Sequence, residues 1–189
     1  IKSIQILNQK SNKISDCIIP AFLKMQKELQ IKDNIKKLVV CTGPGSYTAL
    51  RVGVAFMYGL SFSRKIPLIG ITCTDLLNLA LQESDVEKTL MFICSSNNQN
   101  FICNILNQKH KYFIKKLDNK LQSDSIDYTK YSNSISNYKL SSDILRKFNL
   151  NNRKEIKFAE IIRSNLQQVT SYPSDEIIDP IYISENKAL

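Results

Sequence analysis

The sequence predicts an α/β protein with two lobes, from three observations. Short apolar runs rich in β-branched residues alternate with helix-like segments in the first half of the chain. Two further runs separated by a polar turn, typical of a hairpin, follow in the second half. All five glycines lie between Gly43 and Gly70, so tight backbone geometry is concentrated in the first lobe. We place the lobes at residues 1–88 and 89–189.

The first lobe begins with a weak strand at residues 4–7 and a helix at residues 15–29. Pro20 lies near the start of this helix, where a missing backbone donor does least harm. Residues 38–41 form a continuous apolar run, which is typical of a buried parallel strand. The candidate N-caps of the first helix are Ser11, Asn12 and Ser15.

A turn of sequence GPGS follows the buried strand and is the most distinctive motif of the chain. We expect Pro44 at its first corner and Gly45 at its second corner with a positive φ. Ser46 or Thr48 then caps a helix that runs from about residue 47 to residue 64. The candidate functional residues of this turn are Gly43, Pro44, Gly45, Ser46 and, on the helix, Arg51.

The helix at residues 47–64 is apolar almost all round and carries two stripes of small residues spaced four apart. The stripes are Ala49/Gly53 and Ala55/Gly59/Ser63. Such a helix must be covered on both sides, so we expect a protein partner on its outer side. The alternative is that it is simply a central helix of the fold.

The remaining elements complete a strand, helix, strand, helix order in the first lobe, which implies parallel strands joined by right-handed crossovers. In the second lobe a hairpin and a third strand come first, followed by a polar loop and two helices. The expected ranges are strand 67–72, helix 75–81, strands 90–94, 101–106 and 110–114, loop 123–137, helices 142–148 and 155–167, and strand 181–183.

Composition and charge set bounds on function. No stretch approaches the roughly 18 uninterrupted apolar residues of a membrane span, so we expect a soluble, cytoplasmic protein with no membrane contact. The five cysteines include no CxxC pair, as is typical of buried free thiols in a reducing compartment. Of the net charge of +9, +7 lies in residues 109–157, which hold twelve Lys and Arg against five Asp and Glu. A nucleic-acid surface and a simple compositional bias both explain this excess.

The residues suggest no self-sufficient active site. His110 is the single histidine, which argues against a metal site or a Ser-His-Asp arrangement. The GPGS turn lacks the GK[ST] of a phosphate loop, because Ala49 and Leu50 stand downstream of it. The carboxylates Asp16, Asp33 and Asp75 lie at expected helix ends, where capping accounts for them. We therefore predict no catalytic, cofactor-binding or metal-binding residue in this chain.

The segment GPGSYTALRVGVAFMYGLSFSRKIPLIGITCTDLL closely resembles the signature of the TsaB (YeaZ) family. Weaker similarity extends through the first helix, the hairpin and the closing DPIYI near Pro180. The resemblance implies an actin-like, ribonuclease-H-like (ASKHA) two-lobe fold, paralogous to TsaD. Family members begin with two strands that this sequence lacks, so we expect a natural protein longer by roughly 20 to 25 residues.

The family resemblance also implies a function. Its members are non-catalytic subunits of the tRNA threonylcarbamoyladenosine (t6A) machinery, which pair with the catalytic TsaD and with TsaE. ATP and metal belong to the partner subunits, and tRNA is contacted indirectly through the complex. A homodimer through the same helices is also possible. The implied interface comprises Ile18, Phe22, Met25, Ala49, Gly53, Phe56, Met57, Gly59 and Leu60.

The sequence departs from the family pattern at two places, and two alternative functions lack the residues that they need. Ala49 replaces a usual glycine, and Ser15-Asp16 stands where many members have His-Ser-Glu, so no role of that histidine carries over. A glycoprotease-like peptidase would need metal ligands that the sequence does not offer. A degenerate actin-fold kinase would need a second glycine-rich turn, yet no glycine follows Gly70.

Overall fold

The structure, a computed structural model, describes residues 13–30, 35–95, 100–107, 111–117, 127–148, 150, 152–174 and 177–183. Its elements in chain order are α1 (Ile14–Leu29), β1 (Leu38–Gly43), α2 (Tyr47–Arg64), β2 (Leu68–Thr72), α3 (Cys73–Asn78), the 3-10 helix η1 (Glu83–Lys88), β3 (Thr89–Cys94), β4 (Asn100–Asn107), β5 (Lys111–Leu117), β6 (Asn133–Ser136), α4 (Ser142–Phe148), β7 (Asn152–Glu155), α5 (Phe158–Ser164) and α6 (Leu166–Ser171).

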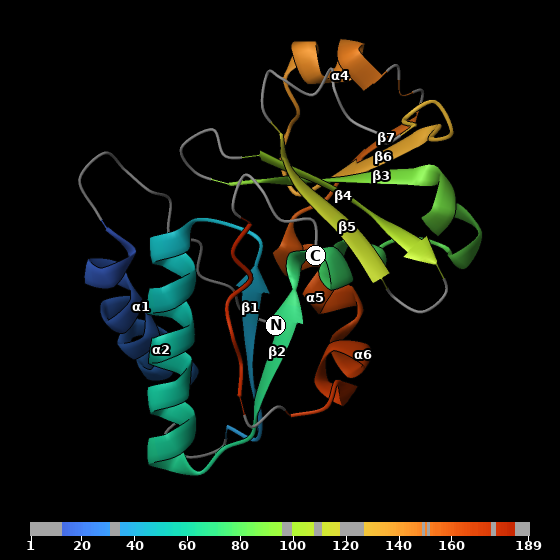
Figure 1. The fold of residues 1–189 in the computed structure, drawn as a ribbon. Helices are drawn as coiled ribbons and strands as arrows, with labels where there is room; N and C mark the ends of the chain where they lie inside the picture. Colours follow the sequence, from blue (N-terminus) through green and yellow to red (C-terminus); the bar gives the residue numbers. More distant parts are fainter. Residues whose placement is uncertain are drawn as a thin grey trace.

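The first sheet is a parallel pair of strands, β1 and β2, as the alternating pattern predicted. Figure 1 shows α1 and α2 on one side of this pair and α6 on the other. Side chains alternate between the two faces of a strand. Leu38 and Val40 of β1 pack with Val54 of α2, while Ile71 of β2 packs with Val169 of α6. The two-stranded sheet is therefore covered on both faces.

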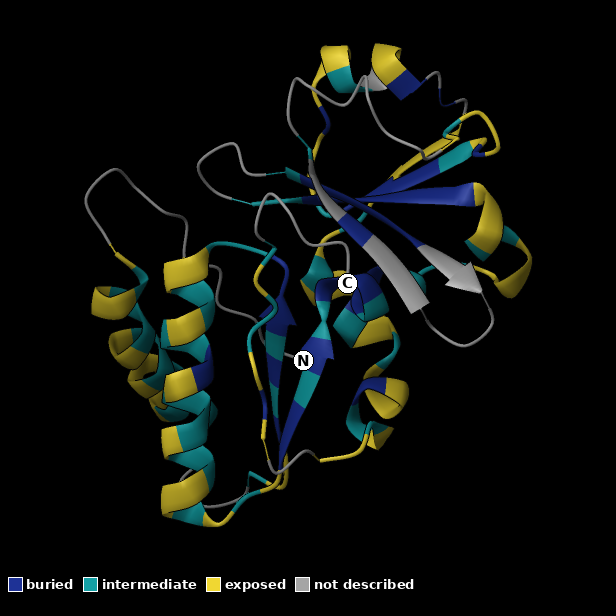
Figure 2. Ribbon diagram, viewed as in Figure 1, coloured by how far each residue is buried: buried dark blue, intermediate teal, exposed yellow. Residues whose placement is uncertain are grey.

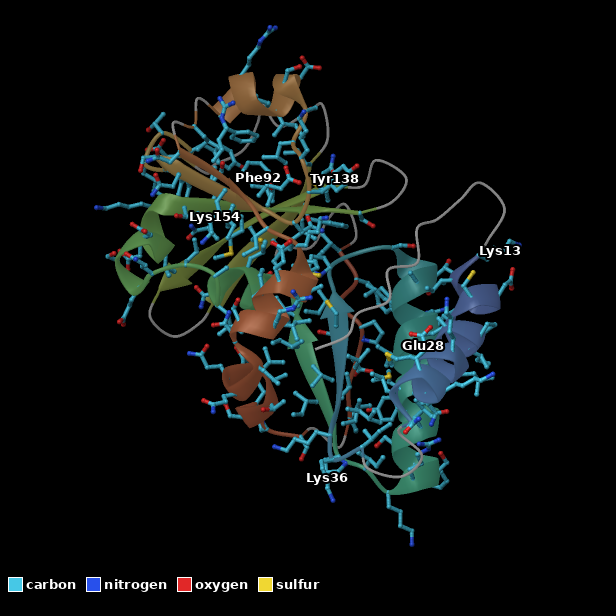
Figure 3. All side chains as sticks on the ribbon, turned by 180° about the vertical axis from the view of Figure 1, so that it is seen from behind. Lys13, Glu28, Lys36, Phe92, Tyr138 and Lys154 are labelled. Atoms are coloured by element: carbon cyan, nitrogen blue, oxygen red, sulfur yellow. The ribbon has the colours of Figure 1, made fainter. Side chains whose placement is uncertain are left out.

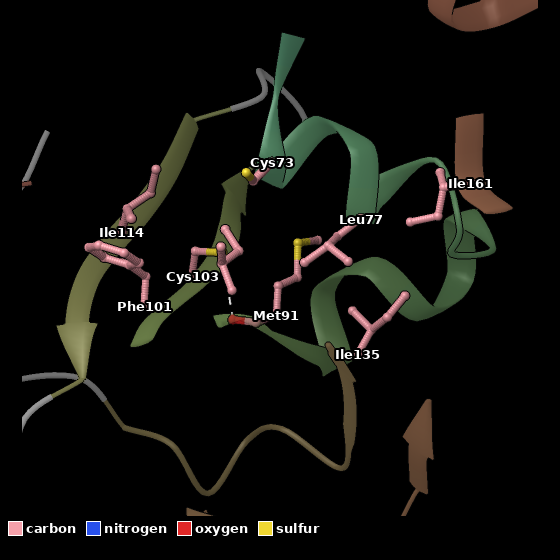
Figure 4. Close-up of a cluster of buried hydrophobic side chains, with 9 residues drawn as sticks. Cys73, Leu77, Met91, Phe101, Cys103, Ile114, Ile135 and Ile161 are labelled. Atoms are coloured by element: carbon pink, nitrogen blue, oxygen red, sulfur yellow. Dashed lines mark hydrogen bonds between the residues drawn. The ribbon is translucent and has the colours of Figure 1, made fainter. Parts of the chain in front are cut away.

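The second sheet has five strands in the order β5-β4-β3-β6-β7. Strands β3, β4 and β5 form an antiparallel meander, and β6 and β7 add in parallel on the other side of β3. The central strand β3 is deeply buried (Figure 2), and Phe92 lies inside this half of the molecule (Figure 3). One buried cluster joins the halves, because Leu77 of α3 and Ile161 of α5 pack with Met91 and Cys103 (Figure 4).

Two strands of the second sheet were not expected from the sequence. The predicted loop 123–137 was wrong at Asn133–Ser136, where the sequence NSIS forms the buried strand β6. Strand β7, of sequence NRKE, is exposed throughout at the edge of the sheet. Neither segment shows an apolar alternation, because both become strands through pairing with a neighbour rather than through their own pattern.

Other expectations need smaller corrections. Helix α1 begins at Ile14 behind Lys13, which makes no side-chain cap, and Pro20 lies in its second turn rather than at its start. The predicted helix 155–167 is divided at Asn165 into α5 and α6. Residues 181–183 are not a strand. The expected strand 4–7, together with Asp33 and His110, lies outside the described residues.

The chain after β7 returns to the two-stranded sheet. Helix α6 packs on one face through Val169, and Ile178 packs on the other face beside α2. The boundary near residue 88 stays a prediction, since the C-terminal residues contribute to the core of the first lobe. None of the helices in the described part of the chain has the length and apolarity needed to span a bilayer.

Candidate functional site

The GPGS turn is formed around Gly43 rather than Gly45. Gly43 has a φ of 109°, and the Gly43–Pro44 peptide is cis, whereas the expected positive φ at Gly45 was wrong. A Cβ at Gly43 would lie 2.8 Å from Cδ1 of Leu50 and 3.2 Å from the carbonyl oxygen of Ile181. Both the backbone conformation and the close neighbours therefore require glycine at this position.

The inner side of this turn is filled by an apolar side chain. Leu50, one turn into α2, also lies within 3.8 to 3.9 Å of the position of a Cβ at Gly45. Ser46 occupies the N-cap position of α2 but makes no side-chain cap, and the carbonyl of Pro44 faces the thiol of Cys73 at 3.4 Å. A phosphate cradle needs several backbone N–H groups directed at open space. The turn is instead packed, and it serves to start α2.

Residues 177–183, which we call the closing segment, pass between α2 and β1 (Figure 1). Ile178 donates its backbone N–H to the hydroxyl of Tyr58, and Ile181 donates its N–H to the carbonyl of Thr42 at 2.7 Å. A Cβ at Gly70 would lie 3.0 Å from Cγ2 of Ile178. Gly43 and Gly70 thus make room for this segment to lie against the sheet.

A cation–aromatic cluster joins the closing segment to the start of α2. The guanidinium of Arg51 lies 4.1 Å from the ring centroid of Tyr47 and 5.6 Å from that of Tyr182. Its Nε donates to the hydroxyl of Tyr182 at 3.2 Å, and this hydrogen bond raises the pKa of Arg51. The two tyrosine rings are 4.6 Å apart. Tyr182 is the partner of Arg51 that sequence reasoning missed, because more than a hundred residues separate them.

Helices α1 and α2 pack against each other through aromatic side chains. The rings of Phe22 and Phe56 meet edge to face at 5.4 Å, and Arg64 lies 5.8 Å from the ring of Phe22. Of the nine predicted interface residues, Met57 and Leu60 pack against the core cluster of β1 and β2, and Gly59 is exposed. The interface stays a prediction. The other six are half-buried: Ile18, Phe22, Met25, Ala49, Gly53 and Phe56.

Helices α1 and α2 carry exposed apolar side chains and two glycines with open space beside them. Phe62 of α2 is 89% exposed, and Ile19 and Leu23 of α1 are 53% and 57% exposed. Among the residues that the structure describes, a Cβ at Gly53 or at Gly59 would meet no atom outside the local helix backbone within 4 Å. The sequence alone did not single out these three residues as exposed. The available signal was their position along each helix, which places them away from the buried side chains.

The described acidic and sulfur side chains form no metal site. Asp75 and Thr72 make a capping box at the start of α3, as expected of a carboxylate at a helix end, and Asp16 lies in the first turn of α1. Within the described ranges, no group of three or more His, Cys, Asp or Glu side chains is placed to hold a metal ion. The five cysteines are free, with Cys73 and Cys103 buried and the other three half-buried.

The two sheets, with helices on both faces of the parallel pair, define an α/β protein (Figure 1). Residues 5–178 match the family model of TsaD, tRNA N6-adenosine threonylcarbamoyltransferase. The chain therefore belongs to this family and is related to the synthesis of t6A. The predicted membership in the actin-like group of TsaD paralogues is confirmed.

Solved structures agree with this assignment of the fold. YeaZ from Pseudomonas aeruginosa is similar with a TM-score of 0.57 at 11% identity, over 91% of this chain and 86% of that one. A crystal structure from Pseudomonas aeruginosa, of an uncharacterised protein with similarity to peptidase YeaZ, has a TM-score of 0.56 at 12% identity, over 88% and 82%. No curated protein matches the chain.

Proposed function

We propose that this chain is a non-catalytic subunit of the t6A machinery, which binds and positions the catalytic TsaD together with TsaE. It has no cofactor of its own in this proposal, and ATP and the metal belong to the partner subunits. tRNA is reached through the complex. Membership in the TsaD family and similarity of fold to YeaZ support a place in t6A synthesis. The exposed apolar side chains and open glycines of α1 and α2 support the role of binding a partner protein.

The observation that carries the proposal is the outer face of α1 and α2. Exposed Phe62, Ile19 and Leu23 provide apolar area, while Gly53 and Gly59 allow another backbone to approach closely. Ile19 and Leu23 lie one turn apart on α1 and form an exposed apolar pair, and contiguous exposed apolar area is typical of protein interaction sites. Because no described atom outside the local helix backbone lies within 4 Å of a Cβ built at either glycine, we assign their lack of a side chain to the close approach of a second molecule.

Reconstitution of the modification reaction tests the role. Purified chain, TsaD and TsaE are combined with tRNA, ATP, threonine, bicarbonate and the enzyme that makes the threonylcarbamoyl adenylate, and modified adenosine is measured. We expect product with all proteins present, little without this chain, and none from this chain alone. Product formed by this chain without TsaD would overturn the proposal.

Substitutions on the outer face test the interface separately. Gly53→Leu with Gly59→Leu adds side chains at two positions where a Cβ meets no described atom within 4 Å, and Phe62→Ala removes the most exposed ring. We expect each to lower affinity for TsaD by about tenfold or more, as central interface residues do. Calorimetric titration provides the measurement.

Tyr138→Ala is the matched control, because Tyr138 is 67% exposed in the five-stranded half (Figure 3). It should leave TsaD affinity unchanged. Unaltered binding by the glycine double variant would show that the interface lies elsewhere. Sedimentation of the same variants alone reports whether a second copy of this chain uses the same face.

A further inference from the structure

Two thiols meet directly behind the GPGS turn. Cys41 of β1 and Cys73, the first residue of α3, have their Sγ atoms 3.2 Å apart. The strand register places Cys41 opposite Ile71, two residues before Cys73, so the contact is built into the β1–β2 pairing. Cys41 is half-buried and Cys73 is buried, so a small reagent from solvent reaches Cys41 first.

The two sulfurs have different chemical characters. The hydrogen bond between the two thiols lowers the pKa of Cys41, whereas the same bond and burial raise the pKa of Cys73. The Cys73 thiol also faces the carbonyl oxygen of Pro44 at 3.4 Å. The thiolate is the reactive form of cysteine, and Cys41 is the more accessible of the two residues, so we assign Cys41 as the attacking sulfur and Cys73 as the resolving one.

We propose that Cys41 and Cys73 form a site of reversible oxidation, at which a hydroperoxide converts the two thiols into an intramolecular disulfide. Cys103, the other buried thiol, lacks this arrangement. Its sulfur lies near the carbonyl of Met91 at 3.6 Å and the hydroxyl of Thr74 at 3.8 Å, and burial raises its pKa to about 12 (Figure 4). Proximity of a second sulfur, together with a more acidic thiol, singles out the Cys41–Cys73 pair.

The chemistry balances in two steps. The Cys41 thiolate attacks one oxygen of hydrogen peroxide, the O–O bond breaks, and the hydroxide released takes up the proton lost by Cys41 to give water. Cys73 then attacks the sulfur of the Cys41 sulfenic acid, the S–O bond breaks, and the departing hydroxide leaves as water with the Cys73 proton. Two thiols and one peroxide thus yield one disulfide and two waters, and a dithiol reductant reverses the change.

The disulfide would alter the part of the chain that presents α2. It closes a covalent loop that contains the GPGS turn, all of α2 and β2, since these lie between Cys41 and Cys73 in sequence. It also removes the thiol hydrogen that faces the carbonyl of Pro44. A cross-link of this kind constrains the unfolded chain, so the oxidised protein should unfold at a higher denaturant concentration than the reduced protein.

Peptide mapping of the full chain tests the proposal. Reduced protein is treated with hydrogen peroxide, its free thiols are blocked, and it is digested with trypsin. The expected product joins peptide 38–51 to peptide 66–88 with a mass about 2 Da below their sum, and dithiothreitol abolishes it. Cys41 and Cys73 both remaining reduced, or either joining another cysteine, would overturn the proposal.

Variants separate the two steps. In Cys73→Ser the sulfenic acid at Cys41 has no resolving partner, so trapping by dimedone at Cys41 should rise well above that in the natural chain. Cys17→Ser, a half-buried thiol on α1, is the control and should retain the 38–51 to 66–88 cross-link. Should Cys73→Ser fail to fold, the peptide map of the natural chain alone decides, because accumulation of sulfinic acid at Cys41 beside a free Cys73 contradicts the proposal.

Discussion

The two halves of the molecule differ in how completely they bury their side chains. In the five-stranded half the residues Leu90, Met91, Phe92 and Ile102 are fully buried, and no glycine occurs in this part of the sequence. In the two-stranded half all five glycines occur, and Val54 is the one buried residue among the 18 of α2. The first region buries its central strand almost completely, whereas the second leaves most of α2 only partly covered.

Four of the five glycines form two kinds, an enclosed pair and an open pair. Gly43 and Gly70 are enclosed by the closing segment, so they serve the fold. Gly53 and Gly59 face space that this chain leaves open. The same residue type therefore has opposite consequences for stability at the two kinds of position, and substitutions can measure the difference.

Truncation in the enclosed half should have the largest effect. Phe92→Ala removes a ring that is 0% exposed and meets Phe148 at 5.5 Å, and we expect a loss of about 3–5 kcal/mol of unfolding free energy. Denaturant titration measures it. Tyr138→Ala, at an exposed position, should stay within about 0.5 kcal/mol. Equal effects at both sites would remove the contrast between core and surface.

The next effect concerns the enclosed glycine of the turn. Gly43→Ala adds a Cβ 2.8 Å from Leu50 at a positive φ, which should cost about 1–3 kcal/mol. Gly45→Ala is the matched control, because its nearest side-chain neighbour is at 3.8 Å and its φ is not positive. Comparable losses for the two variants would mean that the strain is not located at Gly43.

The open glycines should respond with the opposite sign. Gly53→Ala and Gly59→Ala replace helix-interior glycines where nothing lies within 4 Å, so each should stabilise the isolated chain by about 0.5–1 kcal/mol. Thermal and denaturant unfolding both report this gain. A loss of stability on either substitution would place a contact of this chain on the face that we describe as open.

We expect the smallest change in unfolding free energy at the cation–aromatic cluster that joins the closing segment to α2. Tyr182→Phe keeps the ring near Arg51 and removes the hydrogen bond of 3.2 Å, so we expect a loss below about 1 kcal/mol at this exposed site. Arg51→Ala removes both the hydrogen bond and the ring contact and should cost slightly more. If Tyr182→Phe lowered the unfolding free energy as much as Gly43→Ala does, the closing segment would depend on the Tyr182 hydroxyl more than on its packing against the sheet.

Local signals in the sequence were sufficient for much of the first lobe. The helix expected at residues 47–64 has the same bounds as α2, and the carboxylate of Asp75 caps α3 as its position predicted. The run 38–41 indicated a buried parallel strand, which is β1. Periodicity, capping residues and β-branched runs act over a few residues, so they can be recognised without knowledge of the fold.

The tertiary structure alone decided the features that depend on distant parts of the chain. Strands β6 and β7 are strands because β3 and each other offer paired edges, and no pattern in NSIS or NRKE indicated them. The positive φ belongs to Gly43 because Leu50 and Ile181 pack around the turn, and Arg51 meets Tyr182 across the fold. The sequence by itself determined the bounds of α2 and the existence of the buried strand β1, because their signals are local. Which glycines are enclosed, and which thiols meet, followed from packing between segments far apart in the chain.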